Sequence, residues 1–279
     1  MRIDFRPRGE VADEVIARHH AQNMARGLPI IGQAAPKGTP LAVVGGAPGA
    51  KAFLDELWAW DGEIWAINGA YHWLRREGIE ATFLSVSPTL TTVPHAKGAR
   101  KAILGSLCAP ELFDMLISAE IELADLGPDG MAGGTTTACT APMIAAERGH
   151  SHVTMFGVES SFEDRTHAYD GSPVSETRLW VRCGGVEYMT TPQYYMQAEC
   201  LTEVAREVPE YLTVRGDGLL PAMIRHGDWD VTHGSRQLVD AVTKRLAERE
   251  QLHPDWQMTE GLERQELKRP RYVDPKIWS

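Results

Sequence analysis

Short apolar runs alternate with segments of helical composition over residues 41–161, and this alternation limits the possible folds more than any other feature. Six runs are short enough for strands: LAVVGG, EIWAING, ATFLSVSP, KAILGSL, IELADLG and HVTMFGVESS. Most are separated by segments of about ten residues with apolar side chains at helical spacing. Strands separated by helices build βαβ units, which give a parallel sheet. The sequence therefore predicts an α/β fold with a Rossmann-like, mainly parallel sheet and helices on both faces.

The segments next to this region differ from it. Residues 11–26 have a helix-forming composition, which Gly27 and the prolines after it interrupt. After residue 161, ETRLWVRCGGVEYMTT predicts two strands joined around Gly184 and Gly185. The segment PQYYMQAECLTEVAREV predicts a helix, and EYLTVRGDGLL predicts a last strand that ends in a glycine-containing turn.

The C-terminal region predicts one more helix. Residues 235–251 carry apolar side chains along one helical face, and the proline-containing chain that follows predicts an extended tail on the surface or on a partner subunit. We therefore expect an N-terminal helix and lead-in over residues 1–40. A Rossmann-like domain should occupy residues 41–226, and a C-terminal helix and tail residues 227–279.

Composition excludes several protein classes. The 279 residues contain 38 acidic and 28 Lys or Arg side chains, a net charge of −10, which argues against general binding to a nucleic-acid backbone. No apolar run approaches the roughly 18 residues that span a bilayer, and the first residues lack the apolar centre of a secretory signal. The four dispersed cysteines form no CxxC pair, so we expect no zinc site and a reduced, cytoplasmic setting.

The first predicted strand ends in the sequence GGAPG at residues 45–49, which leads into a helix. Small residues let a phosphate approach the backbone, and a helix N-terminus supplies N–H donors and a positive dipole end. The loop matches neither GxxxxGK[ST] nor GxGxxG. Phosphate binding and a tight turn without a ligand are therefore both open interpretations.

The next two strand ends differ in their polar groups. Asn68 ends the second strand, where its amide suits a ribose or a base edge, or caps the following helix. The third strand ends in Ser85 and Ser87 before Pro88 and carries no carboxylate, although metal-dependent enzymes often place an Asp at such a position.

The helix predicted near residue 137 begins with two glycines and three threonines, in the order Gly133, Gly134, Thr135, Thr136 and Thr137. Backbone N–H groups with Thr hydroxyls form a good anion site, whereas the alternative is an ordinary Thr cap after a flexible loop. Two such helix starts on one sheet favour a nucleotide or diphosphate between them.

The sixth strand ends in GVESS and is followed by a loop with further polar groups. Glu159 suits a metal ion, a ribose or a partner Arg, and His167 suits a general base or acid because its ordinary pKa lies near neutrality. A structural role for His167 on a surface loop is the alternative. Asp217, in the sequence RGDG, follows a later strand and is expected beside the same cleft. His19 and His20 lie on the first helix, where we expect no functional role.

The order of these motifs resembles one known family. The motifs are LAVVGGAPG, IWAINGAYHWLRREGI, SVSP, GGTTTACTAPMIAAERGHSHVTMFGVESS, HAYD and VRGDGLLP. Over residues 23–225 they resemble the family of the archaeal 6-hydroxymethylpterin diphosphokinase, which is in turn similar to bacterial sialyltransferases that use CMP-sialic acid. The resemblance implies a Rossmann-like nucleotide-binding fold and group-transfer chemistry.

The resemblance also implies roles for individual residues. Glu159 would stand where the family has Asp, and His167 would lie near the acceptor. Residues that would bind the nucleotide through its phosphates or ribose are Gly45, Gly46, Pro48, Asn68, Gly133, Gly134, Thr135 and Thr136. The chain departs from the family where Ala47 and Gly49 replace Gly and Ser of the first loop and where Ser87 replaces Asp.

Three functional hypotheses follow. A diphosphokinase would use ATP and Mg²⁺ to modify a hydroxymethyl group or another alcohol, with Glu159 and either Asp217 or Asp164 as metal ligands. A glycosyltransferase would use a CMP- or UDP-sugar, with His167 deprotonating the acceptor without metal. A binding module would hold a nucleotide or sugar without turnover. In each case the expected partners are small molecules rather than membranes, with homo-oligomer formation through the C-terminal tail as a further hypothesis.

Overall fold

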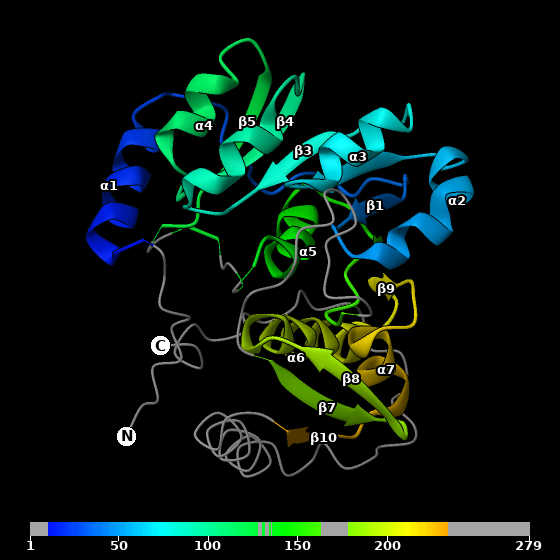
Figure 1. The fold of residues 1–279 in the computed structure, drawn as a ribbon. Helices are drawn as coiled ribbons and strands as arrows, with labels where there is room; N and C mark the ends of the chain where they lie inside the picture. The colour runs from blue at the N-terminus through cyan, green and yellow to red at the C-terminus, as the bar shows by residue number, and fades with distance from the viewer. Residues whose placement is uncertain (1–10, 128–129, 132–133, 135, 163–177, 234–279) are drawn as a thin grey trace.

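Seven parallel strands form one sheet in the order β5-β4-β3-β2-β1-β6-β9 (Figure 1). The computed structural model describes residues 11–127, 130–131, 134, 136–162 and 178–233. The strands are β1 (Leu41–Val44), β2 (Glu63–Ile67), β3 (Thr82–Ser85), β4 (Lys101–Gly105), β5 (Glu120–Ala124), β6 (Val153–Phe156) and β9 (Leu212–Val214). The predicted α/β fold with a Rossmann-like, mainly parallel sheet is therefore confirmed.

Helices cover both faces of this sheet. They are α1 (Asp13–Met24), η1 (Pro48–Phe53), α2 (Leu54–Trp58), α3 (Ala70–Arg76), η2 (Leu90–Ala96), α4 (Pro110–Met115), α5 (Thr137–Glu147), α6 (Pro192–Glu207) and α7 (Leu219–His226). The single helix predicted after the first loop is in fact a 3-10 turn, η1, followed by the short α2, because Phe53 between them leaves the helical conformation (φ −108°, ψ 17°).

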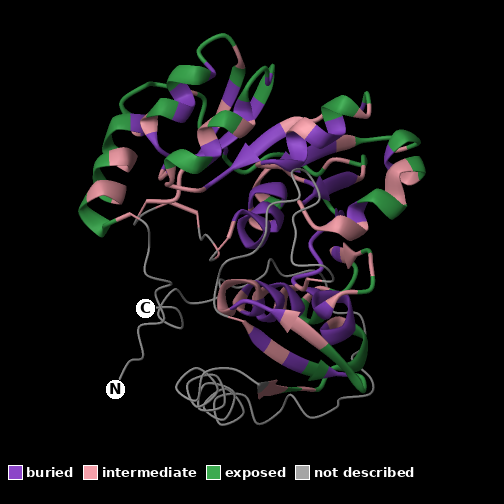
Figure 2. Ribbon diagram, viewed as in Figure 1, coloured by how far each residue is buried: buried purple, intermediate pink, exposed green. Residues whose placement is uncertain are grey.

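Two hydrophobic cores lie on opposite faces of the sheet, and β1 serves both. Leu41 and Val43 belong to the core shared with α5, α6 and α7, whereas Ala42 and Val44 belong to the core under α2, α3 and α4. Strands buried on both faces need apolar side chains at every position, which explains the continuous apolar runs in the sequence. Figure 2 shows the buried residues concentrated in the strands and in α5.

The strand order reverses between β1 and β6. β1 pairs with β2 on one side and with β6 on the other, and β2 to β5 then continue away from β6. In open α/β sheets, ligands bind outside the carboxyl ends of the strands at such a switch point. The candidate site is therefore expected where the chain leaves β1 and β6.

A second, antiparallel sheet contains β7 (Leu179–Cys183), β8 (Val186–Thr190) and β10 (Trp229–His233), in the order β10-β7-β8. The predicted hairpin is confirmed, with Gly184 and Gly185 both at positive φ (57° and 79°) as a tight two-residue turn requires. This sheet packs with α6 and α7 as a lobe below the parallel sheet in Figure 1, and we call it the second lobe.

The prediction of a last strand before Gly218 is wrong in one respect, because α7 and β10 follow it. Pro221 lies in the first turn of α7, where a proline needs no N–H partner and is tolerated. β10 pairs with β7 and lies beyond residue 226, where we expected the Rossmann-like domain to end. The helix and tail predicted over residues 235–279 lie outside the described residues. Within the described ranges, no helix has the length and apolar character to cross a membrane.

Candidate functional site

The loops that follow β1 and β6 are joined by their backbones at the switch point. The Gly45 N–H donates to the Phe156 carbonyl (2.8 Å), and the Ala47 N–H donates to the Gly157 carbonyl (3.0 Å). A Cβ on Gly45 would overlap the Gly157 carbonyl oxygen, and one on Gly157, which has φ +65°, would lie 2.7 Å from the Gly45 oxygen. These two glycines therefore allow the two loops to approach each other.

The rest of the first loop remains accessible to a ligand. Gly46, Pro48 and Gly49 are half-buried, and Gly49 lies in the first turn of η1. We therefore assign different roles to the glycines of GGAPG. Gly45 brings the two loops together, whereas Gly46 and Gly49 lie at the switch point, where the candidate site is expected.

Glu159 lies in the loop after β6, with 6% of its surface exposed and both carboxylate oxygens inaccessible to solvent. A Cβ on Gly49 would overlap its Oε1, and a Cβ on Gly216 would lie 2.9 Å from the same atom. A Cβ on Gly218 would overlap the Glu159 side chain at its Cβ. The carboxylate is therefore enclosed by glycine backbone from the loop after β1 and from the turn after β9.

The turn after β9 is fastened to the loop after β6. The Leu220 N–H donates to the Glu159 carbonyl (2.9 Å), and the Leu219 N–H donates to the Ser161 Oγ (3.0 Å). These bonds satisfy N–H groups in the first turn of α7, which have no partner within the helix. The RGDG turn thus lies beside Glu159, at the carboxyl end of the sheet.

Asp217 lies between Gly216 and Gly218, but its side chain points away from Glu159. Its side chain is 99% exposed and lies 3.9 Å from the Arg225 guanidinium. The neighbouring Gly216 and Gly218 face Glu159 instead. Within the described part of the chain, no three His, Cys, Asp or Glu side chains form a group that fits a metal ion. Mg²⁺ at phosphate sites often takes only one or two protein carboxylates. Glu159 supplies one, but its oxygens are inaccessible to solvent, so Mg²⁺ would reach them only if the glycine turns around them moved.

The N-terminus of α5 is held by threonine hydroxyls. The Thr136 Oγ1 accepts a hydrogen bond from the Cys139 N–H (3.2 Å), which is the predicted N-cap. The Gly134 N–H donates to the Thr140 Oγ1 (3.0 Å), and a Cβ on Gly134 would overlap the Cys139 Cβ. Gly133 and Thr135, predicted to bind the nucleotide, lie outside the described residues.

Two non-glycine residues at this edge have left-handed backbone conformations. They are Asn68, directly after β2 (φ 46°), and Ser160, in the loop after β6 (φ 59°). Such conformations cost free energy and occur often at functional sites. Both residues therefore mark the carboxyl ends of strands close to the switch point.

Asn68 has a buried acceptor atom. Its Oδ1 is inaccessible to solvent and accepts no hydrogen bond from the described residues. The cap of α3 is Gly69, with no side-chain hydrogen bond, so the alternative role of Asn68 as a helix cap is not observed. Burying an acceptor without a donor is costly, and a ribose hydroxyl would reach this inaccessible atom only if the chain around it moved.

The end of β3 carries a row of hydroxyls. Ser87 Oγ lies 2.9 Å from Thr89 Oγ1, which lies 2.7 Å from Thr91 Oγ1. These groups take the place of the carboxylate that the sequence already lacks at this position. His167 and Asp164, predicted as acid–base and metal-binding groups, lie outside the described residues.

Two groups of polar residues at this edge were missed in the sequence. Gln197 of α6 bonds to both Thr136 and Ser160, although neither spacing nor motif indicates this. His20 of α1 was assigned no role, yet its Nε2 lies 2.9 Å from the Asp125 Oδ1. Asp125 directly follows β5, so a search for acids at strand ends would have found it.

The charge of Asp125 is stabilised locally. Burial alone would raise the pKa of Asp125, but hydrogen bonds from the Gly127 N–H and from His20 outweigh this and lower the pKa. This hydrogen bond fastens α1 to the carboxyl end of β5, four strands away from β1 in the sheet.

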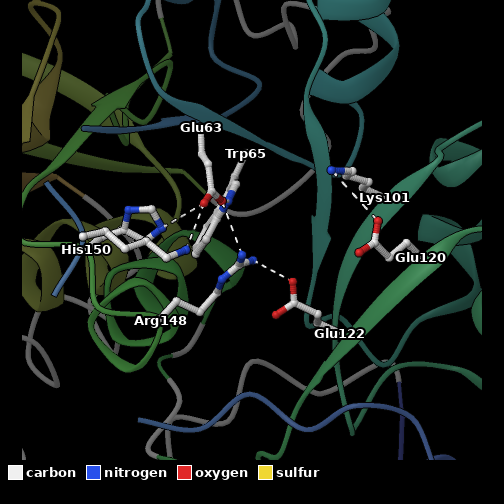
Figure 3. Close-up of polar contacts among 8 residues, drawn as sticks. Glu63, Trp65, Lys101, Glu120, Glu122, Arg148 and His150 are labelled. Carbon is white, nitrogen blue, oxygen red and sulfur yellow. Dashed lines mark hydrogen bonds and ion pairs between the residues drawn. The ribbon is translucent and has the colours of Figure 1, made fainter. Parts of the chain in front are cut away.

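The opposite, amino-terminal edge of the sheet carries a network of ion pairs (Figure 3). Arg148 pairs with Glu122 (3.1 Å) and with Glu63 (3.5 Å), and its guanidinium lies over the Trp65 ring. Burial would raise the pKa of Glu63, but the bond from Lys37 and the charge of Arg148 outweigh it, so the pKa is lowered. This network lies at the ends of the strands away from the candidate site.

Comparison of the sequence with models of known protein families found no matching family, and comparison with curated proteins found no matching relative. The candidate site therefore rests on the geometry of the switch point and on the motifs themselves.

Proposed function

We propose that this chain is a nucleotide-dependent transferase that passes a diphosphate group from ATP to a hydroxymethyl group or another alcohol. The observation that carries this proposal is the meeting of three segments at the switch point. There the loop GGAPG, the buried Glu159 and the RGDG turn come together at the carboxyl ends of the strands. The resemblance of the motifs to the diphosphokinase family supports the same chemistry.

The groups at the switch point offer suitable contacts for each part of the ATP donor. Backbone N–H groups of Gly46 and Gly49 face the phosphates, and the start of α5 adds the N–H groups of its first turn. The Asn68 Oδ1 accepts a hydrogen bond from the ribose. Mg²⁺, when bound, neutralises phosphate charge, and Glu159 is the residue that would hold it.

The reaction then needs few further groups. The acceptor oxygen attacks the β-phosphorus, the bond between this phosphorus and the bridging oxygen of AMP breaks, and AMP leaves. His167 takes the proton of the acceptor hydroxyl. The protein contributes positioning and charge stabilisation rather than a covalent intermediate.

A thermal-shift panel tests the proposal directly. ATP, AMP, CMP, CTP, UDP and GDP are each added with and without Mg²⁺, because ligand at 100 times its Kd adds about 2.7 kcal/mol of stability. A shift with ATP that requires Mg²⁺ supports the diphosphokinase. A metal-independent shift with CMP or UDP would instead favour a glycosyltransferase that uses a nucleotide sugar.

Two variants sharpen this test. Glu159→Gln should remove the Mg²⁺ dependence of ATP binding, because the carboxylate that holds the cation and repels the phosphates is gone. Glu111→Gln, on the exposed side of α4, makes the same change of charge away from the switch point and should behave as the wild type. Turnover is then followed as AMP release with a panel of alcohols. A folded protein that binds ATP yet releases no AMP with any of them would favour the binding module.

A further inference from the structure

One carboxamide in the second lobe joins two loops of the parallel sheet. The Thr136 Oγ1 donates to the Gln197 Oε1 (2.8 Å), and the Gln197 Nε2 donates to the Ser160 Oγ (2.9 Å). Gln197 lies on α6 with 4% of its surface exposed, so these bonds are protected from water. It therefore connects the first turn of α5 with the loop after β6.

Both partners of Gln197 hold key positions at the candidate site. Thr136 is the N-cap of α5, and its Oγ1 accepts from the Cys139 N–H. Ser160 has a left-handed backbone next to Glu159, and the Thr190 Oγ1 fixes its carbonyl with a 2.6 Å bond. A strained residue persists only where its surroundings hold it from several sides. Gln197 and Thr190, both outside the parallel sheet, supply that support.

The bonds of Gln197 also decide which way the hydroxyls point. A hydroxyl carries one hydrogen, and that of Thr136 is directed to Gln197. What Thr136 then offers a ligand is its remaining lone pair and its backbone, rather than a hydroxyl donor. The Ser160 Oγ accepts from Gln197 and donates toward the Val158 carbonyl (3.4 Å). One side chain thus orients the polar atoms of two loops.

We infer that Gln197 is a positioning residue through which the second lobe sets the geometry of the first turn of α5 and of the loop after β6, which carry the phosphate-binding N–H groups and Glu159 of the proposed site. The inference rests on the proposed function for the identity of the ligand. It assigns to α6 a part in nucleotide affinity, although Gln197 acts only through Thr136 and Ser160.

Two variants on α6 test this inference. Gln197→Met keeps the volume of the side chain but removes both hydrogen bonds. Gln193→Met makes the same change as the first variant one turn earlier on α6, where the side chain is half-buried. Urea unfolding of each variant shows whether it is folded.

Nucleotide affinity is measured by calorimetry with ATP and Mg²⁺ and with CMP. We expect Gln197→Met to raise the Kd of the bound nucleotide roughly tenfold. Gln193→Met should leave the affinity unchanged. Wild-type affinity in folded Gln197→Met would overturn the inference while leaving the proposed function intact.

Hydrogen exchange of the ligand-free proteins supplies a second readout. In Gln197→Met, amide exchange should rise both at residues 136–141 and at residues 157–162, the two segments to which this side chain bonds. A rise at one of the two segments, or at neither, contradicts the inference. If both segments respond but no nucleotide binds the wild type, the coupling of the loops stands and the proposed function falls.

Discussion

The two edges of the parallel sheet differ in how they treat polar groups. At the amino edge, Arg148 pairs with Glu63 and with Glu122, and its guanidinium lies over the Trp65 ring. At the carboxyl edge, Glu159 is enclosed by glycine backbone, and Asn68 has a buried acceptor and a left-handed backbone. Charge pairing characterises the first edge, and left-handed non-glycine residues characterise the second.

This contrast suggests a division of roles. Interactions that are complete within the chain contribute to stability, whereas strain and unsatisfied acceptors cost stability and are retained where a ligand repays them. We therefore expect changes at the amino edge to alter the free energy of unfolding without altering nucleotide affinity. Changes at the carboxyl edge should lower nucleotide affinity, and where they relieve strain they should raise the free energy of unfolding.

The largest effect is expected at the start of α5. Gly134→Val should reduce nucleotide affinity by about 100-fold or more, roughly 2.7 kcal/mol, because the new side chain collides with Cys139 in the first turn. Calorimetry with ATP and Mg²⁺ and with CMP measures the loss. Gly32→Val is the matched control, since a Cβ at Gly32 meets no atom within 4 Å. Unchanged affinity in folded Gly134→Val would remove α5 from the site.

Arg148→Ala makes the corresponding change at the amino edge. It should lower the free energy of unfolding by about 2 kcal/mol, because two carboxylates lose their partner and Trp65 loses its cation. Urea unfolding measures this change, and nucleotide affinity should stay as in the wild type. Arg182→Ala, whose Arg side chain is 59% exposed beside Glu187, should cost at most about 0.5 kcal/mol. A parallel fall in affinity for Arg148→Ala would contradict the division between the edges.

The sequence predicts the local parts of the site and misses those that depend on packing. GGAPG, the Thr136 cap and the RGDG turn each carry their signal within a few residues, and each lies at the predicted edge. Gln197 is separated from Thr136 by 61 residues, and His20 from Asp125 by 105. No local pattern encodes such contacts, because they arise only when α6 and α1 dock on the sheet.

The direction of side chains is also hard to predict. Asp217 and Glu159 do come from adjacent segments, as expected, but the turn points Asp217 outward to Arg225. The fold itself was more accessible, since buried parallel strands must be apolar at every position. α7 and β10 were missed because a proline and a short, polar strand obscure their patterns.

Acid should weaken the amino edge first through His150, whose side chain is fully buried. Burial lowers the pKa of His150, and the charges of Lys37 and Arg148 add to this against the opposing charge of Glu63. The unfolded chain therefore binds a proton near pH 6.5 that the folded protein binds only at lower pH. The free energy of unfolding should fall below pH 6.5 by up to about 1.4 kcal/mol per pH unit.

Urea unfolding at pH 7.5, 6.5 and 5.5 measures this dependence, and His150→Gln should flatten it. If His150→Gln retained the full slope, another group would have to carry the proton. The lowered pKa of Glu63 acts in the same direction but at more acid pH, so it does not mask the result.

The smallest effect, and the sharpest test of the contrast, is expected for Asn68→Gly. Glycine adopts the left-handed conformation of residue 68 without strain, and the substitution also removes the buried Oδ1 that lacks a donor. The free energy of unfolding should therefore rise by about 0.5 kcal/mol even though a side chain is lost. Nucleotide affinity should fall at the same time, because the ribose loses its acceptor.

Both quantities come from the same protein sample, by urea unfolding and by calorimetry with the nucleotide that binds. Loss of stability would show that the Asn68 side chain supports the fold, and unchanged affinity would show that its acceptor serves no ligand. Opposite changes in the two quantities are what a residue retained for binding, at a cost to folding, should produce.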